Sequence, residues 1–270
     1  MKSSSLIESL ESRMFLSADA GQLTFGLSYP ETGGVVLNVN GSSAGDKIVI
    51  DTQGSASRGA MVTIGVGKNQ KIFSGITVIN VFGNDGDDTI VLSGKNMDAA
   101  YLPAFLIGGN GNDGIVIRDF DGGVYAVGSE GNDFITARNA VSKFDPPKSL
   151  TSFRGLYGGD GQDTLIGSAG TDYLGGEAGN DIIFGLGNGD DISGGTGTNI
   201  LNGGDGDDLF TVLPLNGLPY GGSSSFGGND LIDGGSGDDT VISYYDSNLT
   251  PIFGTLGTVN VETNLVLTVG

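Results

Sequence analysis

Apolar residues recur at a fixed interval in the second half of the chain. From Gly158 to Thr211 the sequence divides into six consecutive nine-residue units, and the eighth place of every unit is apolar. The units are GGDGQDTLI, GSAGTDYLG, GEAGNDIIF, GLGNGDDIS, GGTGTNILN and GGDGDDLFT. The last three places of a unit are too few for a free-standing strand, so we expect them to pair in parallel with neighbouring units. The eighth-place side chains would then point into a shared core.

The same pattern continues on both sides of this run. Two further units, SFGGNDLID and GGSGDDTVI, span Ser225 to Ile242, and we interpret VLPLNGLPYGGSS between the two blocks as a decayed repeat. Upstream, the turn returns at wider spacing in GNDGDDTIV, GGNGNDGIV and GSEGNDFIT, and in a degenerate form in GSSAGDKIV. Strand-like runs such as TIVL, GIVIR and DFITA flank these turns. These spacings predict coils of two units each, with insertions on one side of the upstream coils.

The polar places are as regular as the apolar ones. Glycine opens each unit of the main run, and the chain contains 51 glycines, 26 aspartates and 6 glutamates. The sixth place carries Asp163, Asp172, Asp181, Asp190, Asn199 and Asp208 in the main run, Asp230 and Asp239 in the second block, and Asp88, Asp113 and Asp133 upstream. Glycine permits left-handed backbone angles, which let carbonyl oxygens converge in a tight turn. Converging carbonyls and short carboxylates suit Ca²⁺, which takes about 6 to 8 oxygen ligands, better than Mg²⁺.

The tandem pattern Gly-Gly-x-Gly-x-Asp-x-apolar-x resembles the repeats-in-toxin (RTX) family of calcium-binding β-rolls. The resemblance is dense over Gly158 to Ile242 and sparse over Gly83 to Thr136. It implies an all-β fold, a right-handed parallel β-helix or β-roll with two units per coil, in which several Ca²⁺ ions lie between turns of alternate repeats. The metal ligands that it implies are Asp88, Asp113, Asp133, Asp163, Asp172, Asp181, Asp190, Asp208, Asp230 and Asp239.

The resemblance also predicts which turns stack. One edge would pair Asp163 with Asp181, and the other would hold Asp172, Asp190 and Asp208. Two departures from the family pattern predict weaker sites: Asn199 replaces an aspartate, and GLGNG before Asp190 has its glycine at the fifth place instead of the fourth. If Asp88, Asp113 and Asp133 continue the first edge, the strands that follow them lie side by side. The alternative is a separate upstream sandwich whose Gly/Asp turns are ordinary hairpin ends.

Composition and charge exclude several function classes. Lys+Arg 12 against Asp+Glu 32 gives a formal net charge of -20, which opposes unaided binding to nucleic acid or to an anionic membrane surface. Without cysteine or histidine there is no disulfide, no thiolate or histidine metal site, and no serine-histidine-acid triad. The sequence contains no run of 18 apolar residues, so it predicts no membrane span. No glutamate closes a twelve-residue EF-hand loop, and no Gly-Lys-Ser/Thr follows GLGNGD, so neither an EF-hand nor a phosphate-binding loop is predicted. The negative charge favours cations as partners, and the Gly/Asp turns make calcium the expected one.

The N-terminus gives an indication of export. Residues 1–20 carry charge throughout and lack the apolar stretch of a standard signal peptide. The piece LESRMFLSA, from Leu10 to Ala18, resembles the short Leu-Glu-x-Arg-x-Leu-Leu-Ser tag of many large predicted secreted proteins of planctomycete bacteria. Phe15 and Leu16 stand where that tag has two leucines. The resemblance predicts an extracellular or cell-surface location, and the other interpretation is a short amphipathic or disordered leader.

Two classes of function fit these features. The first is a secreted calcium-binding structural or adhesive module without chemistry of its own, whose partners include extracellular polysaccharide or cell-surface components. The second is a calcium-dependent β-helix polysaccharide lyase or epimerase. Such an enzyme would need a basic residue beside bound calcium, and its candidate cluster is Arg118, Asp119, Asp121 and Tyr125, with Arg138 and Arg154 on later coils. We expect the first class, because the chain has no tryptophan and few tyrosines to line a sugar groove.

The predicted layout has five parts. Residues 1–20 form the leader, 21–82 a strand-rich N-terminal part with hairpin additions, and 83–157 irregular β-helical coils with Gly/Asp turns on one edge. Residues 158–242 form the regular calcium-binding roll, and 243–270 form a C-terminal strand cap, whose alternating pattern is typical of edge strands.

Overall fold

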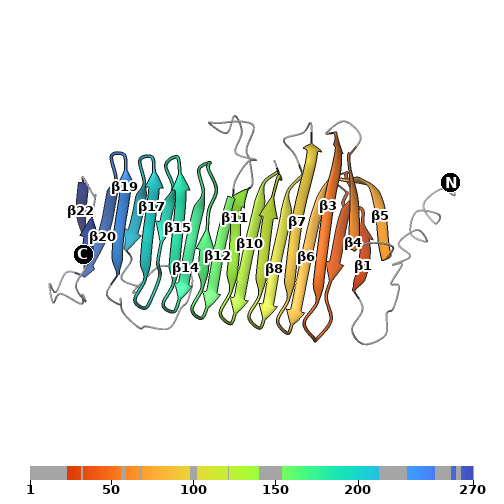
Figure 1. The fold of residues 1–270 in the computed structure, drawn as a ribbon, viewed down its shortest axis with the longest axis horizontal. Coiled ribbons are helices and arrows are strands. Elements are labelled where there is room, and N and C mark those ends of the chain that lie inside the picture. Colours follow the sequence, from red (N-terminus) through yellow and green to blue (C-terminus); the bar gives the residue numbers. More distant parts are fainter. Residues whose placement is uncertain are drawn as a thin grey trace, which may run out of the picture.

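The computed structural model describes residues 23–31, 33–55, 59–66, 69–97, 102–120, 122–139, 154–212, 230–246, 257–259 and 263–269. Within these ranges every regular element is a β-strand, and the strands form two sheets of 11 strands each. They stack along one axis into an elongated solenoid (Figure 1). The expected all-β fold of stacked parallel strands is therefore confirmed. The leader at 1–20 and the decayed repeat, except for its first residue, lie outside the described residues.

The strands of sheet A are, in spatial order, β1 (Thr24–Ser28), β2 (Val36–Asn40), β6 (Val78–Asp85), β8 (Ala104–Asn110), β10 (Val124–Glu130), β12 (Arg154–Asp160), β14 (Tyr173–Ala178), β16 (Asp191–Ser193), β18 (Leu209–Val212), β20 (Thr240–Asp246) and β22 (Thr263–Val269). Those of sheet B are β5 (Asn69–Ile76), β4 (Gly59–Val66), β3 (Lys47–Ser55), β7 (Thr89–Met97), β9 (Gly114–Arg118), β11 (Phe134–Asn139), β13 (Thr164–Ile166), β15 (Ile182–Gly187), β17 (Ile200–Asp205), β19 (Leu231–Ser236) and β21 (Gly257–Val259).

From β6 onward the chain alternates between the two sheets, and each strand pairs in parallel with its equivalent in the next coil. In sheet B, β7, β9, β11 and β13 are consecutive parallel strands. The alternative of a separate upstream sandwich is therefore wrong. The insertions at 98–103, 119–123 and 140–153 connect strands of sheet B to strands of sheet A. The upstream Gly/Asp turns make the opposite connection, from sheet A to sheet B.

The two ends of the solenoid differ. At the N-terminal end, β2 pairs in parallel with β6 and β3 with β7, so coil stacking already begins within residues 21–82. Among the described strands, antiparallel pairing occurs only at this end, where β1 joins β2 and where β3, β4 and β5 form a meander. At the other end β21 and β22 are the last strands of sheets B and A, as the alternating pattern predicted for edge strands.

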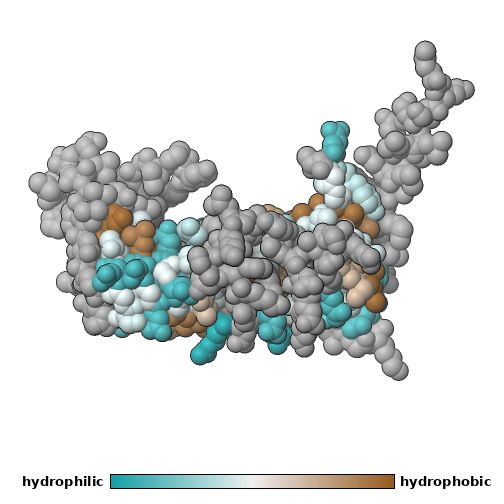
Figure 2. Space-filling model, turned by 90° about the horizontal axis from the view of Figure 1, so that it is seen from above, coloured by the Kyte–Doolittle hydropathy of each residue, from teal (hydrophilic) through white to brown (hydrophobic). Residues whose placement is uncertain are grey.

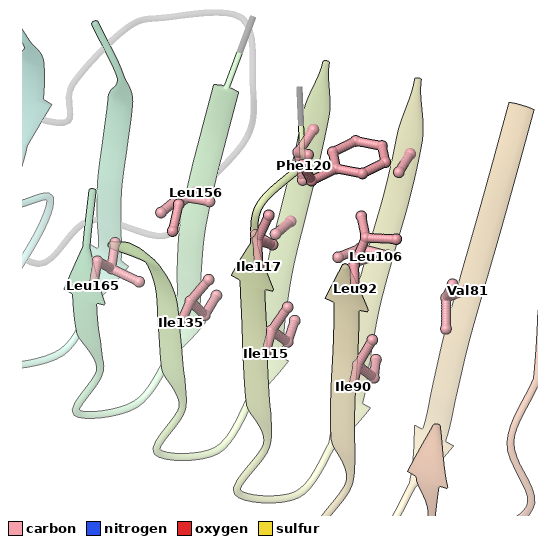
Figure 3. Packing of buried hydrophobic residues seen from close by; sticks show 14 of the residues in the cluster. Val81, Ile90, Leu92, Leu106, Ile115, Ile117, Phe120, Ile135, Leu156 and Leu165 are labelled. Carbon is pink, nitrogen blue, oxygen red and sulfur yellow. The ribbon is translucent and has the colours of Figure 1, made fainter. Parts of the chain in front are cut away.

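The core is one continuous apolar column between the two sheets. In the regular roll each short strand contributes one inward side chain, and each of these is an eighth-place residue: Leu165, Leu174, Ile183, Ile192, Leu201, Phe210, Ile232 and Val241. Upstream strands are longer and contribute two, such as Ile90 and Leu92 from β7 or Ile115 and Ile117 from β9 (Figure 3). The upstream coils therefore bury more apolar surface per coil than the regular roll does.

Candidate metal site in the stacked turns

The turns that lead from sheet A to sheet B stack into a first column. In this column the backbone N–H of each sixth-place residue donates to the Oδ1 of the next sixth-place residue, with N···O distances of 2.6 to 2.9 Å. The column contains, in order, Asp46, Asp88, Asp113, Asp133, Asp163, Asp181, Asn199 and Asp230. The prediction that the widely spaced upstream turns share one edge with the regular roll is confirmed.

The turns that lead from sheet B to sheet A form a second column. Here the N–H of Asp172 donates to Asp190, that of Asp190 to Asp208, and that of Asp208 to Asp239, at 2.8 to 2.9 Å. The predicted stacking of Asp172, Asp190 and Asp208 is therefore confirmed. The second block, which the sequence did not assign to an edge, supplies one residue to each column.

The ladder uses only one oxygen of each carboxylate. The second oxygen, Oδ2, is buried and accepts no hydrogen bond in seven of these residues: Asp88, Asp113, Asp133, Asp163, Asp181, Asp190 and Asp208. An ionised carboxylate oxygen that is buried without a donor or a cation is costly, by several kcal/mol. Repetition of the same arrangement in seven turns indicates that a cation completes it.

A backbone oxygen lies beside six of these seven carboxylates. A β-carbon placed on Gly83 would overlap both the Oδ2 of Asp88 and the carbonyl oxygen of Gly108 in the next turn. The same pair of overlaps occurs at five more first-place glycines, Gly108, Gly128, Gly176, Gly185 and Gly203. A side chain at the first place would overlap these oxygens, so the first place is glycine. A carboxylate and a carbonyl from adjacent turns are the hard ligands that Ca²⁺ takes.

The fourth-place glycines allow the turns to stack this closely. Gly161 has φ 144, and a β-carbon on it would collide with the carbonyl oxygen of Gly131 in the preceding coil. The GLGNG turn lacks this glycine, and Asn188 takes the fourth place with φ 61. Asparagine tolerates this left-handed region better than most residues. Asp190 keeps its place in the ladder despite the altered spacing.

Burial changes the protonation of the ladder. Desolvation raises the pKa of Asp190 to about 8 and that of Asp133 to about 7, in both cases against the backbone N–H bond, which lowers it. Desolvation likewise raises the pKa of Asp88, Asp181 and Asp208 to about 6. Neighbouring carboxylates add to these increases. A bound cation would favour the ionised forms.

Two predicted positions depart from this arrangement. At Asn199 the Oδ1 accepts the N–H of Asp181, so its Nδ2, a donor, lies beside Gly194 where other turns place Oδ2. At Asp172 the Oδ2 accepts hydrogen bonds from Ser168 in the same turn. Ser168 was not among the predicted site residues, although the serine at the second place of GSAGTD, as in GSSAGD, could have marked this turn.

The carboxylates are spread along the columns and are not clustered. In the ranges given above, no group of three or more His, Cys, Asp or Glu side chains is arranged to hold a metal ion. A cation in these turns would therefore take part of its ligand shell from backbone carbonyls, as the glycine positions indicate.

A comparison with known families identifies the turns. The sequence profile of the RTX calcium-binding nonapeptide repeat, in four copies, matches residues 157–192, 184–212 and 226–243. These segments are RTX calcium-binding nonapeptide repeats. They cover well under half of the chain, and no curated protein matches it. RTX repeats bind Ca²⁺ in multiple units, so the chain is a calcium-binding repeat protein. Asp88, Asp113 and Asp133 lie outside the matched segments but within the first column.

The structure places two residues of the candidate lyase cluster on different sheets. Arg118 lies at the exposed end of β9 in sheet B, whereas Tyr125 lies on the exposed face of β10 in sheet A. Asp121 and the side chain of Arg154 lie outside what the structure describes. Among the described residues no helix is long and apolar enough to span a membrane.

Proposed function

We propose that the chain is an extracellular protein whose RTX roll folds on binding calcium, with a structural or adhesive role. The observation that carries the proposal is the buried Oδ2 that accepts no hydrogen bond beside a glycine carbonyl of the next turn, repeated along both columns. We assign metal ligation to the sixth-place carboxylates Asp88, Asp113, Asp133, Asp163, Asp181, Asp190, Asp208, Asp230 and Asp239, and a different role to Asp172, argued below.

The calcium level outside cells would drive folding. At about 1 mM calcium and a site dissociation constant near 10⁻⁴ M, typical of the tighter extracellular modules, each site adds roughly 1.4 kcal/mol to the free energy of unfolding. Several such sites together reach the usual net stability of a domain, about 5 to 15 kcal/mol. At cytosolic calcium levels this contribution is lost. The proposed extracellular location thus agrees with the resemblance of Leu10 to Ala18 to a secretion tag.

An exposed aromatic row supports the adhesive role. The rings of Phe105, Tyr125 and Tyr157 follow one another on the outside of sheet A, with centroids 6.3 and 5.1 Å apart. Phe105 and Tyr125 are about 40% exposed, as is Tyr173 on β14. Aromatic rings with a polar tip stack on sugars and other amphipathic partners. Seen from above, the described surface mixes hydrophobic and hydrophilic residues (Figure 2). Because the net charge of the chain is -20, a neutral polysaccharide is a better partner than an anionic one.

A calcium titration tests the folding proposal. The full chain is dialysed against chelator and titrated with Ca²⁺ while the β signal in circular dichroism and the melting temperature are recorded. We expect both to rise with calcium and to respond far less to Mg²⁺, which prefers octahedral geometry with retained water. An unchanged signal and melting temperature in chelator would refute calcium-dependent folding.

A further inference from the structure

The first turn of each column is built differently from the turns that follow. Residues 41–46 form the first turn of the first column, and residues 167–172 the first turn of the second column. Both join their ladder in the usual way, because the N–H of Asp46 donates to Asp88 and that of Asp172 to Asp190. Both turns carry serine at the second place.

In these two turns a serine occupies one of the two carboxylate oxygens, Oδ2. The N–H and the Oγ–H of Ser168 both donate to the Oδ2 of Asp172, at 2.6 and 2.8 Å. The N–H and the Oγ–H of Ser42 donate to the Oδ2 of Asp46 in the same way, at 2.6 and 2.9 Å. A carboxylate oxygen has two lone-pair positions, and two donors occupy both. This Oδ2 is therefore unavailable to a cation while the serine bonds persist.

The position of Oδ2 has changed as well. In the capped turns it lies 2.9 Å from the point where a β-carbon on Gly41 or Gly167 would be, farther than in the seven turns whose Oδ2 accepts no hydrogen bond. The carboxylate is thus drawn away from the oxygen-lined space and toward the serine. Hydrogen-bond donors therefore satisfy the carboxylate oxygen that, in the proposed function, binds a cation in the other turns.

A serine at the second place is not sufficient for this arrangement. Ser129 occupies the same place in the turn of residues 128–133, but its φ is 94, whereas neither Ser42 nor Ser168 has a positive φ. The Oδ2 of Asp133 accepts no hydrogen bond. The cap therefore depends on the backbone of the turn, and Ser129 provides a matched comparison within the same chain.

We propose that Ser42 and Ser168 cap the first turn of each column without calcium and so set where the two calcium-binding columns begin. This proposal rests on the proposed function, since it assumes that the other turns bind calcium. It assigns Ser168 as a positioning residue and removes the Oδ2 of Asp172 from the metal ligands; the Oδ1 of Asp172, which is buried and does not bond to the serine, is not part of this assignment. The capped turn at residues 167–172 would also stay folded when calcium is absent.

Calcium counting on the full chain tests the proposal. Equilibrium dialysis with radioactive calcium gives the number of ions bound by the wild-type chain, by Ser168→Gly and by the control Ser129→Gly. Ser168→Gly restores the residue found at the second place of turn 158–163 and frees the Oδ2 of Asp172, so we expect one additional ion. Ser129→Gly should leave the number unchanged. Equal numbers in Ser168→Gly and the wild type would overturn the proposal.

Hydrogen exchange in chelator provides a second measurement that does not depend on metal loading. In the wild type we expect slow exchange of the amides of residues 167–172, and in Ser168→Ala exchange about tenfold faster, as the loss of one hydrogen bond implies. Equal exchange rates in the wild type and in Ser168→Ala would overturn the proposal. This comparison remains decisive if Ser168→Gly fails to fold. A wild-type chain that binds no calcium would refute the proposed function alone, because the exchange comparison decides the cap separately.

Discussion

At the scale of the residue, the two oxygens of each sixth-place aspartate have different roles. Oδ1 accepts the backbone N–H of the preceding turn and fixes the stacking, as between Asp163 and Asp181. Where no serine caps it, Oδ2 lies close to a glycine carbonyl of the next turn, and in the proposed function it supplies the charge for a cation. Asn199 retains the first role and loses the second, since its Oδ1 is in the ladder and its Nδ2 replaces Oδ2.

This difference predicts opposite effects of two substitutions on calcium affinity. Asp181→Asn keeps the ladder acceptor but removes a carboxylate, so at about 1 mM calcium the free energy of unfolding should fall by roughly 1.4 kcal/mol. Asn199→Asp adds a carboxylate at an equivalent place, so the midpoint of the calcium titration should shift to lower calcium. The control is Asp160→Asn, an exposed charge in the turn of residues 158–163 that lies outside the ladder. Equal titration midpoints in all variants would contradict the assignment.

The raised pKa values predict an inverse pH dependence of the metal-free fold. Aspartates titrate near pH 4 in an unfolded chain, whereas burial raises the pKa of Asp133 to about 7 and of Asp190 to about 8. Between these values the folded state binds more protons than the unfolded state. The metal-free fold should therefore lose stability as the pH rises from about 4 to about 8. Saturating calcium binds the ionised form, so its stabilising effect should grow over the same range. Melting temperatures with and without calcium at several pH values measure both trends, and parallel curves would refute the linkage.

At the scale of the element, the turn and the strand make different demands on the sequence. The strand of the regular roll needs one apolar residue, and the turn needs glycine wherever a side chain would strike the neighbouring coil. Glycines at both the second and the fourth place lie against the backbone of the neighbouring turn, but the second place also carries Glu177 and Leu186 at positive φ, whereas the fourth place is glycine in nearly every repeated turn. The turn is therefore the more sensitive element.

Gly161→Ala should accordingly be among the most damaging single-methyl changes in the roll. The added β-carbon would meet the carbonyl oxygen of Gly131, and φ 144 is a conformation that alanine rarely adopts. Backbone strain and steric overlap together predict a loss of about 3 kcal/mol in the free energy of unfolding. Gly26→Ala in β1 is the control, since a β-carbon there meets nothing within 4 Å. Thermal unfolding in calcium compares the two variants, and similar losses would show that close stacking does not require the glycine.

These elements also show what a sequence of this kind can predict. The nine-residue period identified the short strands and the inward residues such as Leu174 and Ile183, and the family resemblance identified the two edges of stacked turns, because each follows from one repeated local geometry. The antiparallel meander of β3, β4 and β5 was expected only as hairpin additions, since no period defines its register. The cap at Ser168 was missed because it depends on φ, and Ser129 has the same residue type without the cap.

At the scale of the whole molecule, the two halves of one solenoid have different sources of stability. An upstream coil such as β7 and β8 buries Ile90, Leu92, Ala104 and Leu106, and it has Gly/Asp turns on one edge. A coil of the regular roll, such as β15 and β16, buries only Ile183 and Ile192 and has Gly/Asp turns on both edges. Apolar burial therefore decreases along the axis while the proposed dependence on calcium increases.

This gradient predicts that removal of calcium unfolds the molecule from one side. In chelator the upstream coils should remain folded through apolar burial, and the coils beyond the capped turn at residues 167–172 should open, because their carboxylates then repel one another across closely stacked turns. Limited proteolysis of the full chain in chelator should leave a fragment that ends shortly after Asp172, whereas in calcium protection should extend to β20. Replacing calcium by magnesium at the same ionic strength separates binding from charge screening, and magnesium should leave the shorter fragment. Even digestion of both halves in chelator would show that the solenoid unfolds as one unit and that core size does not divide it.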